Sequence, residues 1–282
     1  MDWVRMINHA IEYMEDHLTD DIALADIAGS VNLSAFHFQR AFSLLTGMSP
    51  AEYLRKRRLS QAGAELAGGK AKVIDTALKY GYDSPESFTK AFTRHHGFTP
   101  AQVRNGNPIR FMNRYTVRIT IDGGAVMEYR IEKWDAVDLL VHAKEFRAET
   151  SEEDIPAFWD VYYGNESYRK VPGYLGVCEQ QKSDGGVFRY GIGCKASDVE
   201  GIPEGFEIIR IPAYTWAVFR CVGPMPDAIQ EMWGKIYREW LPAAEYELIP
   251  DCDIENYLPG NPDAKDYVSE ICIPVRSIGT AG

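Results

Sequence analysis

One short helical pattern occurs twice in this chain, fifty residues apart, and it constrains the fold more than any other feature. Each copy has Ser at the start of a helix, Phe and Ala within it, and Gly followed by Pro at its end. The matched residues are Ser34, Phe38, Ala41, Phe42, Gly47, Pro50 and Ala51, and Ser84, Phe88, Ala91, Phe92, Gly97, Pro100 and Ala101. The repeat predicts two equivalent packing units, which suit a periodic partner such as double-stranded DNA.

A shorter helical pattern precedes each copy, so that both predict a helix, a tight turn and a second helix. The first helices are expected at residues 22–29 and 73–80, with turns at 32–33 and 81–83. An amphipathic opening helix, with apolar residues at helical spacing from Met6 to Leu18, is expected to cover the core. Helix, turn, helix is the arrangement that presents one helix to a major groove of DNA.

The second helix of each unit carries a face that could read bases. In the first copy Phe38, Ala41, Phe42 and Leu45 predict the buried side, and the opposite side, here called the first reading face, is Phe36, Gln39, Arg40 and Ser43. In the second copy, Phe88, Ala91, Phe92 and His95 are expected inside, and the second reading face is Glu86, Thr89, Lys90 and Thr93. Gln can pair with adenine and Arg with guanine. Each good contact contributes roughly 1–3 kcal/mol of discrimination against the wrong base. The alternative is an ordinary solvated helix face.

Between the copies, residues 51–66 predict one continuous helix with a basic run that includes Arg55 and Arg58. A stiff connector could hold the two reading helices about 34 Å apart, one turn of DNA, so that one chain meets two successive major grooves. The Arg55 and Arg58 side chains would then neutralise phosphates.

The charge distribution supports this division of labour. The net charge is −11, yet residues 1–106 carry 12 basic and 12 acidic residues, so the whole imbalance falls in residues 107–282. Residues 37–104 hold 11 basic and 5 acidic residues. We expect a DNA-reading module fused to an acidic part that does not touch DNA.

Beyond a linker at 105–108 and a short strand expected at 119–124, the order strand, helix, strand, strand occurs twice. The strands are predicted at 128–141, 174–180, 187–194, 206–221, 253–258 and 266–275, and the helices near 157–163 and 231–241. The predicted fold is therefore an all-α double helix-turn-helix domain (1–106), a linker with a short strand (107–124), and an α+β domain (125–282). In that last domain, duplicated βαββ units form an antiparallel sheet with helices on one face, leaving a groove between the halves.

Acids and aromatic residues point to a ligand site in this second half. Strand alternation puts Glu255 and Tyr257 on one face, and Glu270 follows on a neighbouring strand. If Ile254 and Leu258 face the helices, Glu255 faces the groove. A carboxylate among aromatic rings in a partly dry pocket favours a bound cation. The alternative, a strand carboxylate in water, is the commoner situation for Glu270.

Other chemistry finds little support. The five cysteines lack metal-ligand spacing and predict buried thiols, and His95 and His96 point in different directions on a helix. No metal and no cofactor are expected. The first residues contain acids and no long apolar run, so we expect a cytoplasmic protein with no membrane partner.

The two helical units carry a family resemblance. The segments IAGSVNLSAFHFQRAFSLLTGMSPAEYLRKRRL and ALKYGYDSPESFTKAFTRHHGFTPAQVR resemble the two helix-turn-helix units of AraC/XylS transcription regulators. The resemblance covers residues 5–105 and implies that Phe36, Gln39 and Arg40, and Glu86, Thr89 and Lys90, contact bases. Pro85 and Glu86 depart from the uncharged residues frequent in the family, so the first copy is expected to dominate specificity.

The second half is similar to GyrI-like effector-binding domains over residues 125–275. The similarity is carried by MEYRIEKWDAV, MWGKIYREWLP, IENY and EICIPV. It implies that Glu255 meets cationic ligands. Tyr190, Tyr214, Trp216 and Tyr257 are the expected aromatic pocket residues.

The sequence thus predicts a transcription regulator without enzymatic activity, which binds double-stranded DNA and responds to a small hydrophobic or cationic organic ligand. One alternative is a GyrI-like small-molecule hydrolase with Glu255 as general base and Tyr257 as its partner. Another is a protein-interaction module that holds the regulator inactive or recruits RNA polymerase. Whether the chain acts as a monomer or dimer stays open.

Overall fold

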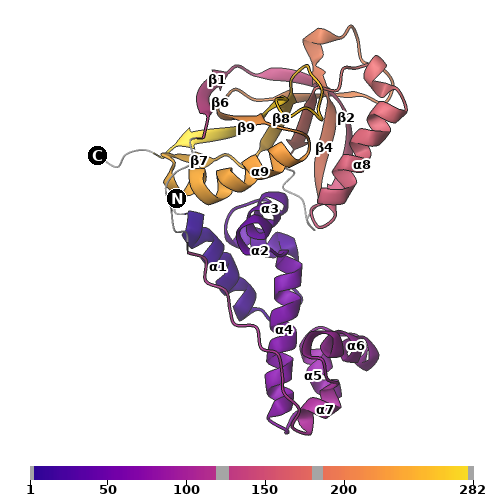
Figure 1. The fold of residues 1–282 in the computed structure, drawn as a ribbon, viewed down its shortest axis with the longest axis vertical. Helices are drawn as coiled ribbons and strands as arrows, with labels where there is room; N and C mark the ends of the chain where they lie inside the picture. Colours follow the sequence, from indigo (N-terminus) through magenta and orange to yellow (C-terminus); the bar gives the residue numbers. More distant parts are fainter. Residues whose placement is uncertain (1–2, 119–126, 180–186, 279–282) are drawn as a thin grey trace.

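A computed structural model describes residues 3–118, 127–179 and 187–278, arranged as an elongated helical domain and a sheet domain (Figure 1). The expected strand at 119–124 lies outside the described residues. Within them, no helix is both long and apolar enough to cross a bilayer. All five cysteines are free and buried, as predicted.

The first helical unit comprises α1 (Trp3–Asp16), α2 (Leu24–Ser30) and α3 (Ala35–Thr46). Ser34 accepts a hydrogen bond from the His37 amide and caps α3, and Gly47 ends it with a positive φ of 74°. Helix α1 buries the predicted apolar side, including Ile7, Ile11 and Met14. The repeat thus gives the helix boundaries that it predicts.

Helix α4 (Pro50–Ala67) is the continuous connector, and the second unit follows as α5 (Val73–Lys79), α6 (Pro85–His96) and α7 (Pro100–Arg104). Ser84 caps α6 and Gly97 ends it with φ 84°. His96, rather than the predicted His95, is fully buried on α6, because its ring reaches back to the Leu59 carbonyl of α4 at 2.9 Å. Figure 1 shows α3 and α6 near opposite ends of α4.

Residues 105–118 return along the helical domain as an extended strap (Figure 1). The Asn8 side chain pairs with both the amide (2.8 Å) and the carbonyl (2.9 Å) of Val117. Closer to α4, the Met112 amide donates to the Ser60 hydroxyl at 3.0 Å. The strap therefore ties α1 and α4 together before the chain enters the sheet domain.

The sheet domain is one antiparallel sheet in the order β1-β6-β9-β8-β3-β4-β2-β5, with β7 pairing to β9. The strand predicted at 128–141 is two strands in the structure, β1 and β2. The strand predicted at 206–221 is likewise two strands, β5 and β6. The strands are β1 (Tyr129–Trp134), β2 (Val137–Arg147), β3 (Leu175–Glu179), β4 (Val187–Lys195), β5 (Glu207–Ile211), β6 (Tyr214–Val222), β7 (Tyr246–Leu248), β8 (Cys252–Tyr257) and β9 (Val268–Ser277).

The duplication is visible in the pairing. Strand β3 of the first half pairs with β8 of the second half at the centre of the sheet. The short first strand of each half pairs with a strand of the other half: β1 pairs with β6, and β5 pairs with β2. Helices α8 (Ser151–Gly164) and α9 (Asp227–Lys235) lie on the same face of the sheet (Figure 1). The α9 helix continues through one π-helical turn (Ile236–Trp240) into α10 (Leu241–Ala243).

Apolar clusters cover both faces of the sheet. On the face beneath α9, Phe219 and Ile271 join a cluster that also contains Trp3 and Phe42 of the helical domain. On the opposite face, Trp216, Ile254 and Cys272 form a separate cluster. The condition that Ile254 faces the helices is therefore not met, since β8 is turned so that Glu255 lies on the helix side.

Candidate functional site

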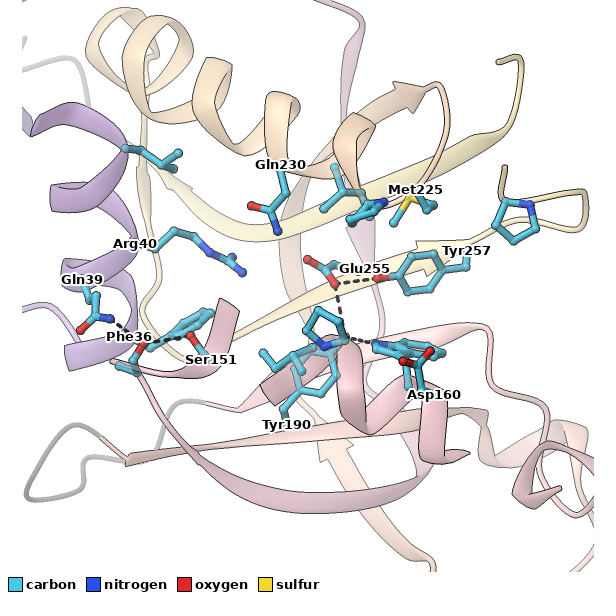
Figure 2. Close-up of a pocket in the computed structure, with 18 of the residues that line it drawn as sticks. Phe36, Gln39, Arg40, Ser151, Asp160, Tyr190, Met225, Gln230, Glu255 and Tyr257 are labelled. Atoms are coloured by element: carbon cyan, nitrogen blue, oxygen red, sulfur yellow. Dashed lines mark hydrogen bonds between the residues drawn. The ribbon is translucent and has the colours of Figure 1, made fainter. Parts of the chain in front are cut away.

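A cavity of about 400 Å³ lies where the helical domain meets the sheet domain. Its walls come from α3, α8, α9 and the loop between β8 and β9 that carries Pro262, and its floor comes from β4 and β8 (Figure 2). The lining residues are Phe36, Gln39, Arg40, Leu44, Ala148, Ser151, Ile155, Pro156, Trp159, Asp160, Tyr163, Tyr190, Met225, Pro226, Ile229, Gln230, Glu255, Tyr257, Pro262 and Tyr267. We call it the interdomain pocket.

Glu255 of β8 is the carboxylate at the floor of this pocket. Its Oε2 accepts hydrogen bonds from the hydroxyls of Tyr257 at 2.8 Å and Tyr190 at 3.3 Å. Its Oε1 accepts from the Trp233 indole at 3.2 Å. Glu255 is half-buried, so it can present charge to a ligand in a partly dry site.

Two tyrosines hold this carboxylate as neutral donors. The pKa of Tyr190 lies well above the ordinary tyrosine value because the ring is buried and the Glu255 charge is close. Burial and the same carboxylate raise the pKa of Tyr257. Both phenols therefore keep their protons at physiological pH and can donate to Glu255.

A glycine on the central strand makes room for the aromatic floor. Gly176 of β3 pairs with Glu255 of β8. A Cβ at Gly176 would clash with the Tyr190 hydroxyl and lie 3.3 Å from the Trp159 ring. Trp159 in turn donates to the Tyr190 hydroxyl at 3.0 Å and meets the Tyr257 ring edge-on, with centroids 5.0 Å apart. The floor is thus an aromatic assembly built around one carboxylate.

Three residues of the first reading face, Phe36, Gln39 and Arg40, line the α3 wall of the pocket. Phe36 packs on Phe188 of β4, with ring centroids 4.1 Å apart. Gln39 donates to the Ala148 carbonyl at 2.5 Å. The Arg40 guanidinium lies 4.1 Å from the Trp233 ring centroid and 4.4 Å from that of Phe36. These contacts place α3 against the sheet domain.

Buried charges accompany this docking. Asp253, on the same side of β8 as Glu255, is only 3% exposed and lies 3.3 Å from His37 Nε2 and 3.9 Å from Arg40 Nη1. Burial works against the charge of Arg40, but Asp253 and Glu255 more than offset it, so the pKa of Arg40 is raised. Arg40 is therefore a permanent cation held in the pocket wall.

The expectation that the first reading face is exposed is wrong for this structure. Phe36 is 4% exposed, Gln39 9% and the Arg40 side chain 19%, while Ser43 is half-buried. The physical reason is that α3 packs on two sides. One side contributes to the core of the helical unit, and the other packs against the sheet domain. That these residues contact bases stays a prediction, which requires α3 to leave the pocket.

The second reading face lies open. Glu86 and Lys90 are exposed, and Thr89 and Thr93 are half-buried. The face borders a shallow surface depression formed by α6 alone, and Figure 1 shows α6 in the half of the helical domain that lies away from the sheet. This face can meet a partner without any rearrangement of the domains.

The basic run on α4 has divided roles. Arg58 donates to the carbonyls of Leu18 (2.8 Å) and Asp20 (2.5 Å), and so closes the turn between α1 and α2. Its guanidinium is committed to the backbone rather than free for phosphate. Arg55 is exposed, and its contact with phosphate stays a prediction.

Three predicted pocket residues lie on the other face of the sheet. Trp216 is fully buried and stacks on Trp134, with centroids 4.7 Å apart, and the Tyr214 hydroxyl donates to Asp251 at 2.7 Å. Glu270 pairs with Arg130 at 2.8 Å and accepts from Asn256 at 3.1 Å. Their assignment to the pocket is wrong, because the alternation along β6 and β9 turns them away from the helices.

Arg40 and Trp159 line the interdomain pocket and Trp233 donates to Glu255, and none of the three was predicted there. Trp233 is buried, and the indole groups of Trp159 and Trp233 both donate hydrogen bonds at the floor of the pocket, to Tyr190 and Glu255. Phe36 was the available signal for Arg40, since a large aromatic ring on a face otherwise polar favours packing against another surface. In the described part of the chain, no cluster of three metal-ligating side chains occurs.

Comparisons with known proteins agree with this architecture. Residues 127–276 match the model of the GyrI-like small molecule binding domain, and residues 27–106 match a helix-turn-helix domain. The right origin-binding protein of Escherichia coli (strain K12) is 25% identical over 304 positions, covering 98% of this chain and 100% of that protein. The HTH-type transcriptional activator AarP of Providencia stuartii is 38% identical over 99 residues, 35% of this chain and 73% of that protein.

A third relative, the uncharacterized HTH-type transcriptional regulator YbfP of Bacillus subtilis, is 34% identical over 134 residues. That match covers 48% of this chain and 43% of the relative, so the chain spans less than half the length of that protein.

Proposed function

This chain belongs to the family of GyrI-like small molecule binding proteins, here joined to a helix-turn-helix DNA-binding domain of the AraC type, and we propose that it is a ligand-responsive transcription regulator. Its helical domain binds a DNA site and its sheet domain binds a small hydrophobic cation. Such a protein works in the cytoplasm, where its DNA lies, and contact with RNA polymerase stays a prediction.

The observation that carries the ligand class is the setting of Glu255. Its carboxylate lies in a pocket of about 400 Å³ and is held by hydrogen bonds from Tyr257, Tyr190 and Trp233. Aromatic faces and a fixed negative charge favour an organic cation whose charge is spread over an apolar body. The pocket volume suits a molecule of a few aromatic rings.

A hydrolytic role has weaker support from the same geometry. Both Glu255 oxygens already accept hydrogen bonds from aromatic donors, and burial and the Glu255 charge raise the pKa of Tyr257, so that phenol stays protonated and has no phenolate to accept a proton. Among the described lining residues, the aliphatic hydroxyl is that of Ser151, which donates to the Ala148 carbonyl at 2.9 Å. These groups favour holding a ligand over attacking it.

Calorimetry on the full chain tests the ligand class. Methyltriphenylphosphonium is a compact aromatic cation, and triphenylphosphine oxide is its neutral counterpart of almost the same shape. We expect the cation to bind and the oxide to bind at least tenfold more weakly, and Glu255→Gln to remove most of this preference.

Glu270→Gln is the matched control, because it removes a carboxylate from the opposite face of the same sheet and should leave the affinity unchanged. Equal affinity of the wild-type chain and the Glu255→Gln variant for the cation would overturn the proposed ligand class.

A further inference from the structure

The helical domain supplies a positive charge to the interdomain pocket. The Arg40 guanidinium points from α3 toward Glu255 (Figure 2) and lies 4.1 Å from the centre of the Trp233 ring. The Trp233 indole is at the same time a donor to Glu255 at 3.2 Å. An aromatic face beside carboxylates is the environment that an organic cation would itself seek.

From this juxtaposition we infer that Arg40 is an internal occupant of the cation site, so that a cationic ligand opposes the docking of α3 and frees the first reading face for DNA. The inference rests on the proposed function, because it assigns a mode of regulation to the same pocket. It makes Arg40 a residue of the ligand site as well as a candidate base-reading residue.

Beside the apolar cluster that Trp3 and Phe42 share with the sheet domain, the docked state is held by charged contacts that can be exchanged. The two ion pairs of Asp253, at 3.3 Å to His37 and 3.9 Å to Arg40, are longer than the strong charged hydrogen bonds of about 2.7–2.9 Å. Separation of α3 from β8 would return Asp253 to water, which offsets the loss of these pairs. The charged part of the interface therefore does not lock the domains.

A ligand cation changes this balance in one direction. The ligand cation would pair with the Glu255 carboxylate and lie near the Phe36 and Trp233 rings that Arg40 also contacts. Two positive charges so close together in a partly dry pocket repel each other. A ligand that binds the undocked state more tightly shifts the population toward that state by its difference in affinity. By the reciprocity of linkage, docking of α3 weakens the ligand by the same factor.

The experiment compares cation affinity in full-chain variants by calorimetry with methyltriphenylphosphonium. Arg40→Gln keeps polarity and approximate length but removes the competing charge, and we expect it to bind the cation about tenfold more tightly than wild type. Arg55→Gln, an exposed arginine on α4, is the matched control and should bind as wild type does. Equal or weaker binding by Arg40→Gln would overturn the inference.

A second variant leaves the pocket charges in place. Arg238, an exposed residue of the sheet domain, donates to the Leu44 carbonyl of α3 at 3.0 and 2.5 Å. Arg238→Ala loosens docking without touching Glu255, and we expect about threefold tighter cation binding. No change in affinity would count against the inference even if Arg40→Gln does not fold.

Glu255→Gln separates the two proposals. If it weakens cation binding while Arg40→Gln has no effect, the ligand class stands and the role of Arg40 falls. If wild type and all variants bind the cation and the neutral oxide equally, the proposed function itself fails.

Discussion

Two copies of one helical unit meet different surroundings in this molecule. Position 36 of the first copy corresponds to 86 of the second, and likewise 39 to 89, 40 to 90 and 43 to 93. In α3 this face is packed over the interdomain pocket, whereas in α6 it lies open. The helix-forming pattern is therefore the same in both copies, but the residue at each face position decides what that helix does.

The residues at the first matched position, Phe36 in α3 and Glu86 in α6, show why one face is buried and the other is exposed. Phe36 can bury its ring against Phe188, while a glutamate there would lose its hydration without a partner. Arg40 and Lys90 are both positively charged. The Arg40 charge is stabilised by the Trp233 ring and by the carboxylates of Asp253 and Glu255. We infer that the second unit is constitutively available to DNA and the first is conditionally available.

The largest expected effect concerns α4, which holds the two units at a fixed distance. Arg57 is buried and pairs with Glu15 through two hydrogen bonds of 2.6 and 2.7 Å. Arg57→Ala leaves the Glu15 charge in a mostly buried place, so we expect a loss of about 3–5 kcal/mol in the free energy of unfolding. Urea denaturation measures it.

Arg55→Ala is the control for that experiment, since the Arg55 side chain is exposed on the same helix. We expect a change within about 0.5 kcal/mol. Similar losses in both variants would mean that the basic run is not divided into structural and free members.

The next effect tests the comparison at its first matched position. Phe36→Ala removes a ring that is 4% exposed, and we expect it to lower the free energy of unfolding by about 3–5 kcal/mol. Glu86→Ala, at the corresponding place on α6, should change it by less than about 0.5 kcal/mol. Equal effects in urea denaturation would show that the two faces have the same environment in solution.

A smaller effect is expected for DNA binding without ligand. On a site selected from a random DNA pool, Thr89→Ala should weaken binding by about 1–3 kcal/mol, the value of one base contact, while Gln39→Ala at the matched position of α3 should change it less than twofold. Fluorescence anisotropy measures both. The opposite ranking would mean that α3 reads DNA from the start.

The smallest effect concerns a histidine that only the second copy carries, where the first has Leu45. Burial, followed by the neighbouring charge of His96, lowers the pKa of His95 from 6.5 to about 4. The unfolded chain takes up this proton at a higher pH than the folded chain, so stability falls as the pH drops from about 6.5 toward 4. His95→Gln should reduce the difference in Tm between pH 7 and pH 5, and an unchanged difference would contradict this assignment.

Much of the fold followed from local patterns in the sequence. Ser34, Gly47, Ser84 and Gly97 mark helix ends by their own chemistry, so the boundaries of α3 and α6 were predictable. Glu255 was correctly placed in a pocket, although its strand is turned opposite to the expected side. Alternation along a strand identifies two faces but not which of them the helices cover, and Trp216 and Tyr214 were misplaced for the same reason.

The docking of α3 could not be read from periodicity. A helical pattern shows which side is apolar enough for its own domain, and it says nothing about a second domain more than a hundred residues away in sequence. Gln39 bonds to the Ala148 carbonyl and Arg238 to the Leu44 carbonyl. Polar groups of these kinds are equally well solvated by water, so their residue types do not predict the contacts. Only the arrangement in space reveals them.

Hydrogen exchange on the full chain, with and without saturating methyltriphenylphosphonium, tests the central claim most directly. Amides near the first reading face on α3, and the facing segment at 146–151, should exchange at least tenfold faster when the cation is bound, while those of α6 should not change. Slower or unaltered exchange at α3 would contradict the account, because the ligand would then hold the first reading face in place instead of releasing it.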